Sequence, residues 1–281
     1  MKALPPSVSL IEAARDYPVY EIRHAKAEAR IAAHGAHVMN WKPASATHEV
    51  VYLSPDAILR EGKAIRGGIP ICWPWFNAHP SDPKLPSHGY ARDRFWELRE
   101  ANEDENGVQL VFTLDLPALN AELRIACGET LDLTLTTRNN GPETIALSGA
   151  LHSYFSVSNI REVVITGLAE SDYLDTVGKR TPRHQNGDVR ISEEVDRIYH
   201  SVSAVTLHDP TWKRAILIEK SGSPSTVIWN PWIEKAAALG DLPDEAYEDF
   251  VCIESAIANE SAIALEPGQS HGLSTRISLI D

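Results

Sequence analysis

Titratable side chains stand at or near the ends of three apolar stretches of the sequence. His152 lies in ALHSYFSV, Glu254 lies in FVCIES, and Asp196 lies in VDRIY. A histidine and a carboxylate often act together in general acid–base catalysis, with ordinary pKa values of about 6.5 and 4.3. Each residue also has a structural interpretation. The histidine could be satisfied within the core, the glutamate could be the first residue to face water, and Asp196 could form a weak local ion pair with Arg197.

The stretch 66–92 reads RGGIPICWPWFNAHPSDPKLPSHGYAR and begins and ends with an arginine. Gly67 and Gly68 let backbone amides approach a bound group, because no side chain intervenes. Five prolines stiffen the segment, and His88 lies near its end. Long ordered loops are more often functional than idle. The alternative is a proline-stiffened surface loop that covers buried tryptophans.

The sequence lacks the patterns of several other chemistries. No serine or cysteine lies in a nucleophile motif, no histidines have zinc-type spacing, and neither a P-loop nor a dinucleotide fingerprint is present. The remaining set favours general acid–base chemistry without a metal or other cofactor, on a polar substrate stacked against tryptophan. That set contains His152, Glu254, Asp196, His88 and the two arginines of the stretch 66–92.

Short alternating runs predict that the elements carrying these residues are strands. The run 130–138, TLDLTLTTR, alternates cleanly, and segments 96–101 and 108–114 flank the polar turn NEDENG. Helical periodicity is confined to short stretches such as 233–239. We therefore expect an all-β chain, a large antiparallel sandwich with few short helices. Prolines near the start suggest a lead-in over residues 1–18, followed by a single domain over 19–281.

Bulk composition narrows the classes of partner. The 281 residues are 43% hydrophobic and 23% charged, with a formal net charge of −13. This acidity argues against nucleic-acid or anionic-membrane binding, and no apolar run is long enough to span a bilayer. Cys72, Cys127 and Cys252 lack metal-type spacing, which suits free thiols in a reducing cytoplasm. No secretory signal is recognisable. We expect a cytoplasmic protein that is a monomer.

A series of longer blocks resembles a known family. The blocks RGGIPICWPWF, PSHGYAR, LHSYFSV, VDRIY, VIWNPW and FVCIES occur in this order between Arg66 and Ser255. In this they resemble the hexose-6-phosphate mutarotases, or glucose-6-phosphate 1-epimerases, of the aldose 1-epimerase superfamily. The resemblance implies an antiparallel β-sandwich of the galactose-mutarotase type, with its site on the concave face of one sheet.

The resemblance also implies roles for individual residues. His152 matches the general acid that protonates the sugar ring oxygen, and Glu254 matches the general base at the anomeric hydroxyl. Arg66 and Arg92 match the arginines that hold the sugar phosphate. Further substrate contacts are expected from Asp196, His88, Ser87, Trp229 and Asn230, with Lys235 and Asp241 as additional candidates.

The implied reaction is the interconversion of the α and β anomers of a hexose 6-phosphate, most simply glucose 6-phosphate. Ring opening needs one proton removed from the C1 hydroxyl and another given to the ring oxygen, so a carboxylate and an imidazole suffice. A neighbouring carboxylate would help to keep the histidine protonated. Two alternatives stay open: an aldose 1-epimerase that acts on unphosphorylated sugars, and a carbohydrate-binding sandwich without catalytic activity.

Overall fold

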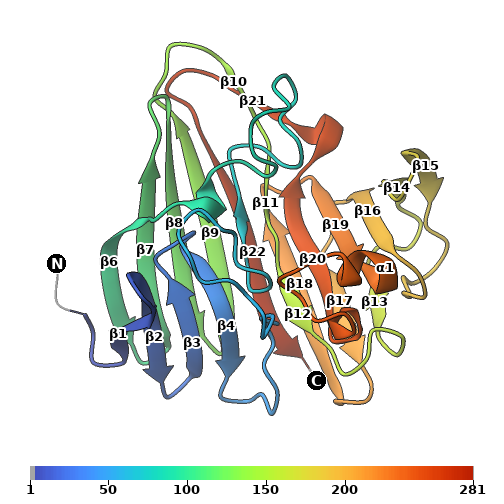
Figure 1. Cartoon of the computed structure of the whole chain (residues 1–281), viewed down its shortest axis with the longest axis horizontal. Coiled ribbons are helices and arrows are strands. Elements are labelled where there is room, and N and C mark those ends of the chain that lie inside the picture. Colours follow the sequence, from blue (N-terminus) through green and yellow to red (C-terminus); the bar gives the residue numbers. More distant parts are fainter. Residues whose placement is uncertain (1–3, 281) are drawn as a thin grey trace.

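Antiparallel strands dominate the computed structural model, which describes residues 4–280 (Figure 1). The run with the cleanest alternation forms β9 (Thr130–Asn139), where Leu131, Leu133 and Leu135 are buried and the polar residues between them, Asp132 and Thr134, are partly exposed. One face of this strand therefore packs on the core while the other faces outward. The predicted hairpin is also confirmed, as β6 (Glu97–Asp104) paired with β7 (Gly107–Asp115).

Strand β9 belongs to an eight-stranded sheet that forms one layer of the molecule. Its order is β13-β17-β18-β22-β9-β8-β7-β6. The remaining strands of this layer are β13 (Val164–Thr166), β17 (Val205–Asp209), β18 (Arg214–Ser221), β22 (Ser270–Ile280) and β8 (Leu119–Gly128).

A second eight-stranded sheet carries most of the candidate residues, and its path runs β15-β14-β16-β19-β20-β11-β5. Strand β20 (Phe250–Ile257) is buried at every position, as expected for a central strand covered on both faces. The other strands are β15 (Thr181–His184), β14 (Asp172–Asp175), β16 (Val195–His200), β19 (Ser225–Asn230), β11 (Gly149–Leu151), β5 (Ile71–Cys72) and β12 (Tyr154–Ser156), which also pairs with β20. A separate pair joins β10 (Ile145–Leu147) to β21 (Ile263–Leu265).

The expected lead-in over residues 1–18 was wrong for the part that the structure describes. Strand β1 (Val8–Ala14) pairs with β2 (Tyr17–His24), and both belong to a four-stranded sheet with β3 (Ala27–Ala32) and β4 (His37–Pro43). Pro18 is accommodated within β2, opposite Glu12 of the edge strand β1. Prolines at such positions do not prevent pairing, which is why they misled the sequence interpretation. Residues 1–3 lie outside the described part of the chain.

The layers pack face to face, which confirms the predicted sandwich. Strands β2 and β3 contact β7 and β8, while β11 and β20 contact β22. Buried side chains of all three large sheets join in one core, with Trp41, Phe112 and Phe155 among its bulkiest members. Cys72, Cys127 and Cys252 are all buried and free.

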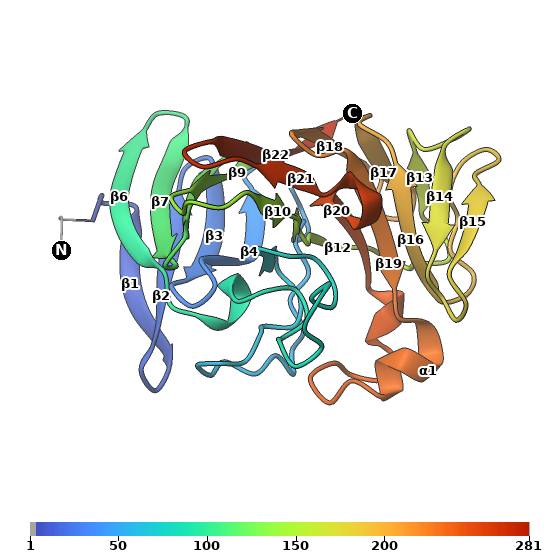
Figure 2. The same cartoon turned by 90° about the horizontal axis from the view of Figure 1, so that it is seen from above.

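Helical segments are few and short, as the sequence predicts. They are α1 (Trp232–Ala237) and the 3-10 turns η1 (Ala91–Asp93), η2 (Ala246–Glu248) and η3 (Asn259–Ser261). Within residues 4–280, no helix has the length and hydropathy to cross a bilayer. In Figure 2 helix α1 and the long connection from β4 to β6 lie on the same side of the sheets. Together they overhang the face of β16, β19 and β20.

Candidate active site

Most of the predicted residues meet in one cavity of about 550 Å³, between the sheet face and the two overhanging segments. The cavity is lined by strands β16, β19 and β20 on one side and by parts of residues 62–93 on the other, with Lys235 and Asp241 near helix α1. The predicted residues that line it are Arg66, His88, Arg92, His152, Asp196, Trp229, Lys235, Asp241 and Glu254. Ser87 and Asn230 do not line it.

Strand pairing places three of these side chains on one face of the sheet. Asp196 of β16 lies opposite Trp229 of β19, and Val227 of the same strand lies opposite Glu254 of β20. Directly opposed residues share a face, and residues two apart along a strand share it too. The regular backbone therefore presents a carboxylate, an indole and a second carboxylate side by side.

His152 and Glu254 are in direct contact. His152 directly follows β11 and its backbone amide donates to the carbonyl oxygen of Pro70, over 3.0 Å. Its Nε2 lies 3.3 Å from Oε1 of Glu254, and the two side chains are 12% and 1% exposed. The imidazole Nδ1 and the carboxyl Oε2 are buried without a protein partner. Each member of the pair thus keeps one polar atom available for a bound molecule.

Burial shifts both groups of this pair toward their neutral forms. It lowers the pKa of His152 well below its usual range, and the nearby His88, Arg92 and Arg66 add to this shift. It raises the pKa of Glu254 well above its usual range, and the charge of Asp196 adds to it. The sequence analysis expected the neighbouring carboxylate to keep His152 protonated. That expectation was wrong, because the cost of removing both groups from water outweighs their mutual attraction.

The two arginines differ in their partners. Arg66 donates from Nε to Oδ1 of Asp241 over 3.0 Å and from Nη2 to Oδ2 over 3.4 Å, and Nη1 donates to the hydroxyl of Tyr154. Arg92 donates from Nη2 to the backbone carbonyl of Ser87 over 2.9 Å, while its Nε is buried and unpartnered. Asp241 therefore orients Arg66, and Ser87 contributes a carbonyl oxygen that orients Arg92.

His88 faces the His152–Glu254 pair from the loop side. Its backbone has a φ of +66°, and its Nδ1 accepts a hydrogen bond from the amide of Asn77 over 3.3 Å. Its ring centre lies 6.0 Å from that of His152. Burial lowers the pKa of His88 to about 3, and the charges of Arg92 and Arg66 contribute. Because Nδ1 accepts this bond, the neutral imidazole carries its proton on Nε2, which can donate one hydrogen bond to a sugar hydroxyl.

Asn230 has a structural role and does not contact the cavity. It is fully buried, and its amide donates to the carbonyl oxygens of Tyr247 and Phe250, each over 2.9 Å. Its own oxygen accepts from the amide of Trp232, at the start of α1. All three contacts are with backbone atoms, so Asn230 anchors the segment that carries Lys235 and Asp241.

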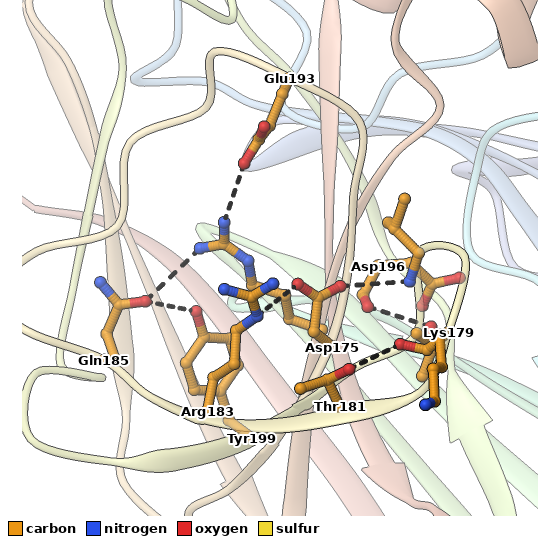
Figure 3. Close-up of polar contacts among 11 residues, drawn as sticks. Asp175, Lys179, Thr181, Arg183, Gln185, Glu193, Asp196 and Tyr199 are labelled. Carbon is orange, nitrogen blue, oxygen red and sulfur yellow. Dashed lines mark hydrogen bonds and ion pairs between the residues drawn. The ribbon is translucent and has the colours of Figure 1, made fainter.

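Asp196 is held at the rim of the cavity by the turn after β14. Thr176 donates to its backbone carbonyl from the amide over 2.8 Å and from the hydroxyl over 3.0 Å. Figure 3 shows the polar contacts beside Asp196, where Arg183 contacts Asp175 at 3.0 Å and Tyr199 donates to Gln185. Burial raises the pKa of Asp196, although the Thr176 hydroxyl and Lys235 oppose the shift.

Sequence reasoning missed Tyr154, Lys63 and Asp93, which also line the cavity. The Tyr154 ring stacks on the His152 ring with centres 5.0 Å apart and planes 15° apart. A signal for Tyr154 was present, because a residue two positions after His152 in an extended segment lies on the same side. Lys63 and Asp93 lie in irregular segments, where no periodicity indicates which side chains face inward.

Comparison with known proteins identifies the family to which the chain is similar. A profile of the family described as "Aldose 1-epimerase" matches residues 18–278. A relative from Salmonella typhimurium, named "Putative glucose-6-phosphate 1-epimerase", is 34% identical over 262 residues, which cover 89% of this chain and 87% of the relative. A relative of the same name from Cenchrus ciliaris is 35% identical over 268 residues, covering 86% and 78%.

Solved structures agree with these matches. A crystal structure titled as a "putative mutarotase" from Salmonella typhimurium superposes with a TM-score of 0.92 at 30% identity, covering 100% of this chain and 96% of that one. A galactose mutarotase related enzyme from Lactobacillus acidophilus gives a TM-score of 0.72 at 15% identity, covering 94% and 97%, and shares the fold alone. The sandwich is galactose mutarotase-like, and the chain belongs to the aldose 1-epimerase family.

Proposed function

We propose that this aldose 1-epimerase interconverts the α and β anomers of hexose 6-phosphates, with glucose 6-phosphate as the first substrate to test. One observation carries the proposal: the buried His152–Glu254 pair, 3.3 Å apart, opens onto a cavity that two arginines also border. The two relatives described above carry a glucose-6-phosphate 1-epimerase name, which supports the same substrate class.

The chemistry of the pair follows from its protonation. Burial favours a neutral imidazole on His152 and a protonated carboxyl on Glu254, so one transferable proton resides on the carboxyl group. Shifting that proton from Glu254 to His152 gives a carboxylate and an imidazolium without exchange with solvent. A sugar with its C1 hydroxyl at Glu254 and its ring oxygen at His152 would then replace the direct contact between them.

Ring opening is balanced by these two groups. Glu254 takes the proton of the C1 hydroxyl, the C1–O5 bond breaks, and His152 gives its proton to O5. The product is the open-chain aldehyde, whose C1–C2 bond rotates. In ring closure the groups exchange roles, and attack of O5 on the other face of C1 produces the other anomer. Trp229, set edge-on to His152 with ring centres 6.0 Å apart, offers an apolar surface for the sugar.

One observation favours the alternative, an aldose without a phosphate. Asp241 binds Arg66 through both carboxylate oxygens and offsets its charge, so the arginine pair presents less net charge than its sequence suggests. Catalytically inert carbohydrate binding is disfavoured, because a pure binding site has no need for a contacting acid–base pair.

Anomer exchange measured by NMR tests the proposal. Saturation transfer between the α and β C1 protons would be followed for glucose 6-phosphate, mannose 6-phosphate, galactose 6-phosphate and glucose. The expected result is a higher kcat/KM for at least one of the phosphorylated sugars than for glucose. Equal kcat/KM values for glucose and every phosphorylated sugar would favour an epimerase of unphosphorylated aldoses. If anomer exchange were accelerated for none of these sugars, the protein would be a carbohydrate-binding protein without catalytic activity.

A further inference from the structure

The cations that border the cavity differ in how far their charge is already neutralised. Arg66 is paired with Asp241 at 3.0 Å, and Lys235 is paired with Glu194 at 3.0 Å. Among residues 4–280, no carboxylate oxygen lies within 4.0 Å of the charged nitrogens of Lys63 or Arg92. Lys63 and Arg92 therefore keep the charge that an anionic ligand would meet.

Lys63 and Arg92 act on the same wall of the cavity. Lys63 is exposed at the rim, three residues before Arg66, and Arg92 is half-buried. Asp93 lines the same cavity, and burial raises its pKa while the charges of Arg92, His34 and Lys63 oppose that rise. The buried Nε of Arg92 has no protein partner, so this wall also offers an unused hydrogen-bond donor.

A phosphate monoester needs more charge than Arg66 supplies. At pH 7 it carries a charge of about −1.5 to −2 and three strong acceptor oxygens. An arginine that donates to both carboxylate oxygens of an aspartate can still donate from the remaining N–H groups of its guanidinium. The arginine–aspartate pair as a whole, however, is close to neutral. Arg92 by itself provides one positive charge.

We propose that Lys63 is a specificity-determining residue that supplies, with Arg92, the net positive charge of the phosphate subsite. Arg66 then contributes hydrogen bonds from a guanidinium that Asp241 holds in place. This inference rests on the proposed function and refines it, because it identifies which side chains separate a sugar phosphate from a free sugar. Since Lys63 is exposed at the rim, its contribution should weaken at high ionic strength.

The test is Lys63→Met, which keeps the length of the side chain and removes its charge. The expected result is a rise in KM for glucose 6-phosphate of about 3- to 10-fold, with kcat nearly unchanged and kinetics on glucose unaltered. Raising the salt concentration should increase the KM of the parent more than that of the variant. Lys63→Arg should restore most of the affinity.

Lys84→Met is the matched control. Lys84 is exposed on the same long loop but does not line the cavity, so this variant removes the same charge from outside the site. Its KM should equal that of the parent. A similar rise in both variants would mean that net charge, rather than a local contact, sets affinity, and would overturn the inference.

The outcomes separate this inference from the function on which it rests. If the parent prefers glucose 6-phosphate but Lys63→Met changes its KM by less than twofold, the role of Lys63 is refuted and the proposed function stands. If Lys63→Met raises the KM for glucose equally, the residue acts through shape and the charge argument is refuted. If the parent shows no preference for any phosphorylated sugar, the proposed function itself fails.

Discussion

The two walls of the cavity are built in different ways. One wall is the face of β16, β19 and β20, where Asp196, Trp229 and Glu254 project from continuously paired backbone. The other wall comes from residues 62–93, whose regular elements are only the two-residue strand β5 and the turn η1. The strand wall carries one partner of the proposed acid–base pair, and the loop wall carries three cations. The difference suggests that chemistry depends on the rigid wall and substrate choice on the irregular one.

The largest expected effect comes from replacing the two residues of the proposed acid–base pair. Glu254→Gln keeps the shape of the side chain and removes the proposed base, so kcat for anomer exchange should fall by about a hundredfold or more. His152→Ala should have a loss of the same order. NMR exchange rates at saturating substrate measure both. Glu260→Gln, at an exposed position beyond the end of β20, is the matched control. A near-normal rate in either active-site variant would refute the assigned mechanism.

A second change tests whether Asn230 supports the walls or contacts the sugar. Asn230→Ala removes three hydrogen bonds of about 1 kcal/mol each, two buried and one partly buried, so the free energy of unfolding should fall by roughly 2–3 kcal/mol. At 25 °C the KM should change little. Urea denaturation gives the stability, and Asn102→Ala, at an exposed position on β6, is the control. A variant with the parent's stability and a weakened KM would make Asn230 a substrate contact after all.

The loop wall is tested by Arg92→Ala. Losing this charge and its donors should raise the KM for glucose 6-phosphate about tenfold, while kcat and the kinetics on glucose change less. Arg92→Lys keeps the charge but loses the planar fork, so it should fall between the parent and Arg92→Ala. If Arg92→Ala instead lowered kcat as strongly as Glu254→Gln does, the division of labour between the walls would not hold.

The smallest expected effect concerns the stability of the strand wall. Burial holds the pKa of Glu254 well above its ordinary value of about 4.3. Above that pH the unfolded chain releases this proton while the folded protein retains it, so folding stability falls as pH rises. Glu254→Gln does not ionise in either state. Its melting temperature should exceed that of the parent by about 2–4 °C at pH 8, with the advantage shrinking toward pH 5. A difference independent of pH would contradict the raised pKa.

The sequence was sufficient for the features that repeat along a strand. Alternation located β9 and the β6–β7 hairpin, and the conspicuous blocks located His152, Glu254 and Asp196. It was not sufficient where the outcome depends on tertiary burial. The direction of the pKa shifts at His152 and Glu254 follows from the walls that enclose them, which no local pattern encodes.

Adjacency in sequence was also a poor guide to the direction of a side chain. Ser87 and Asn230 lie next to the cavity residues His88 and Trp229, yet one contributes only a carbonyl oxygen and the other is fully engaged with backbone. Lys63 lies in an irregular segment without any recurring spacing. Its place at the rim emerges only when the loop is folded over the sheet.

Backbone hydrogen bonds connect the loop wall to the segment that carries His152, and they limit how the protein could be redesigned. Strand β5, within the loop wall, pairs with β11, and the amide of His152 donates to Pro70 just before β5. A transplanted loop from another sugar-binding sandwich would therefore shift the histidine along with the cations. Retargeting the enzyme to a different sugar should succeed by exchanging individual side chains such as Lys63, with the segment from Arg66 to β5 left intact.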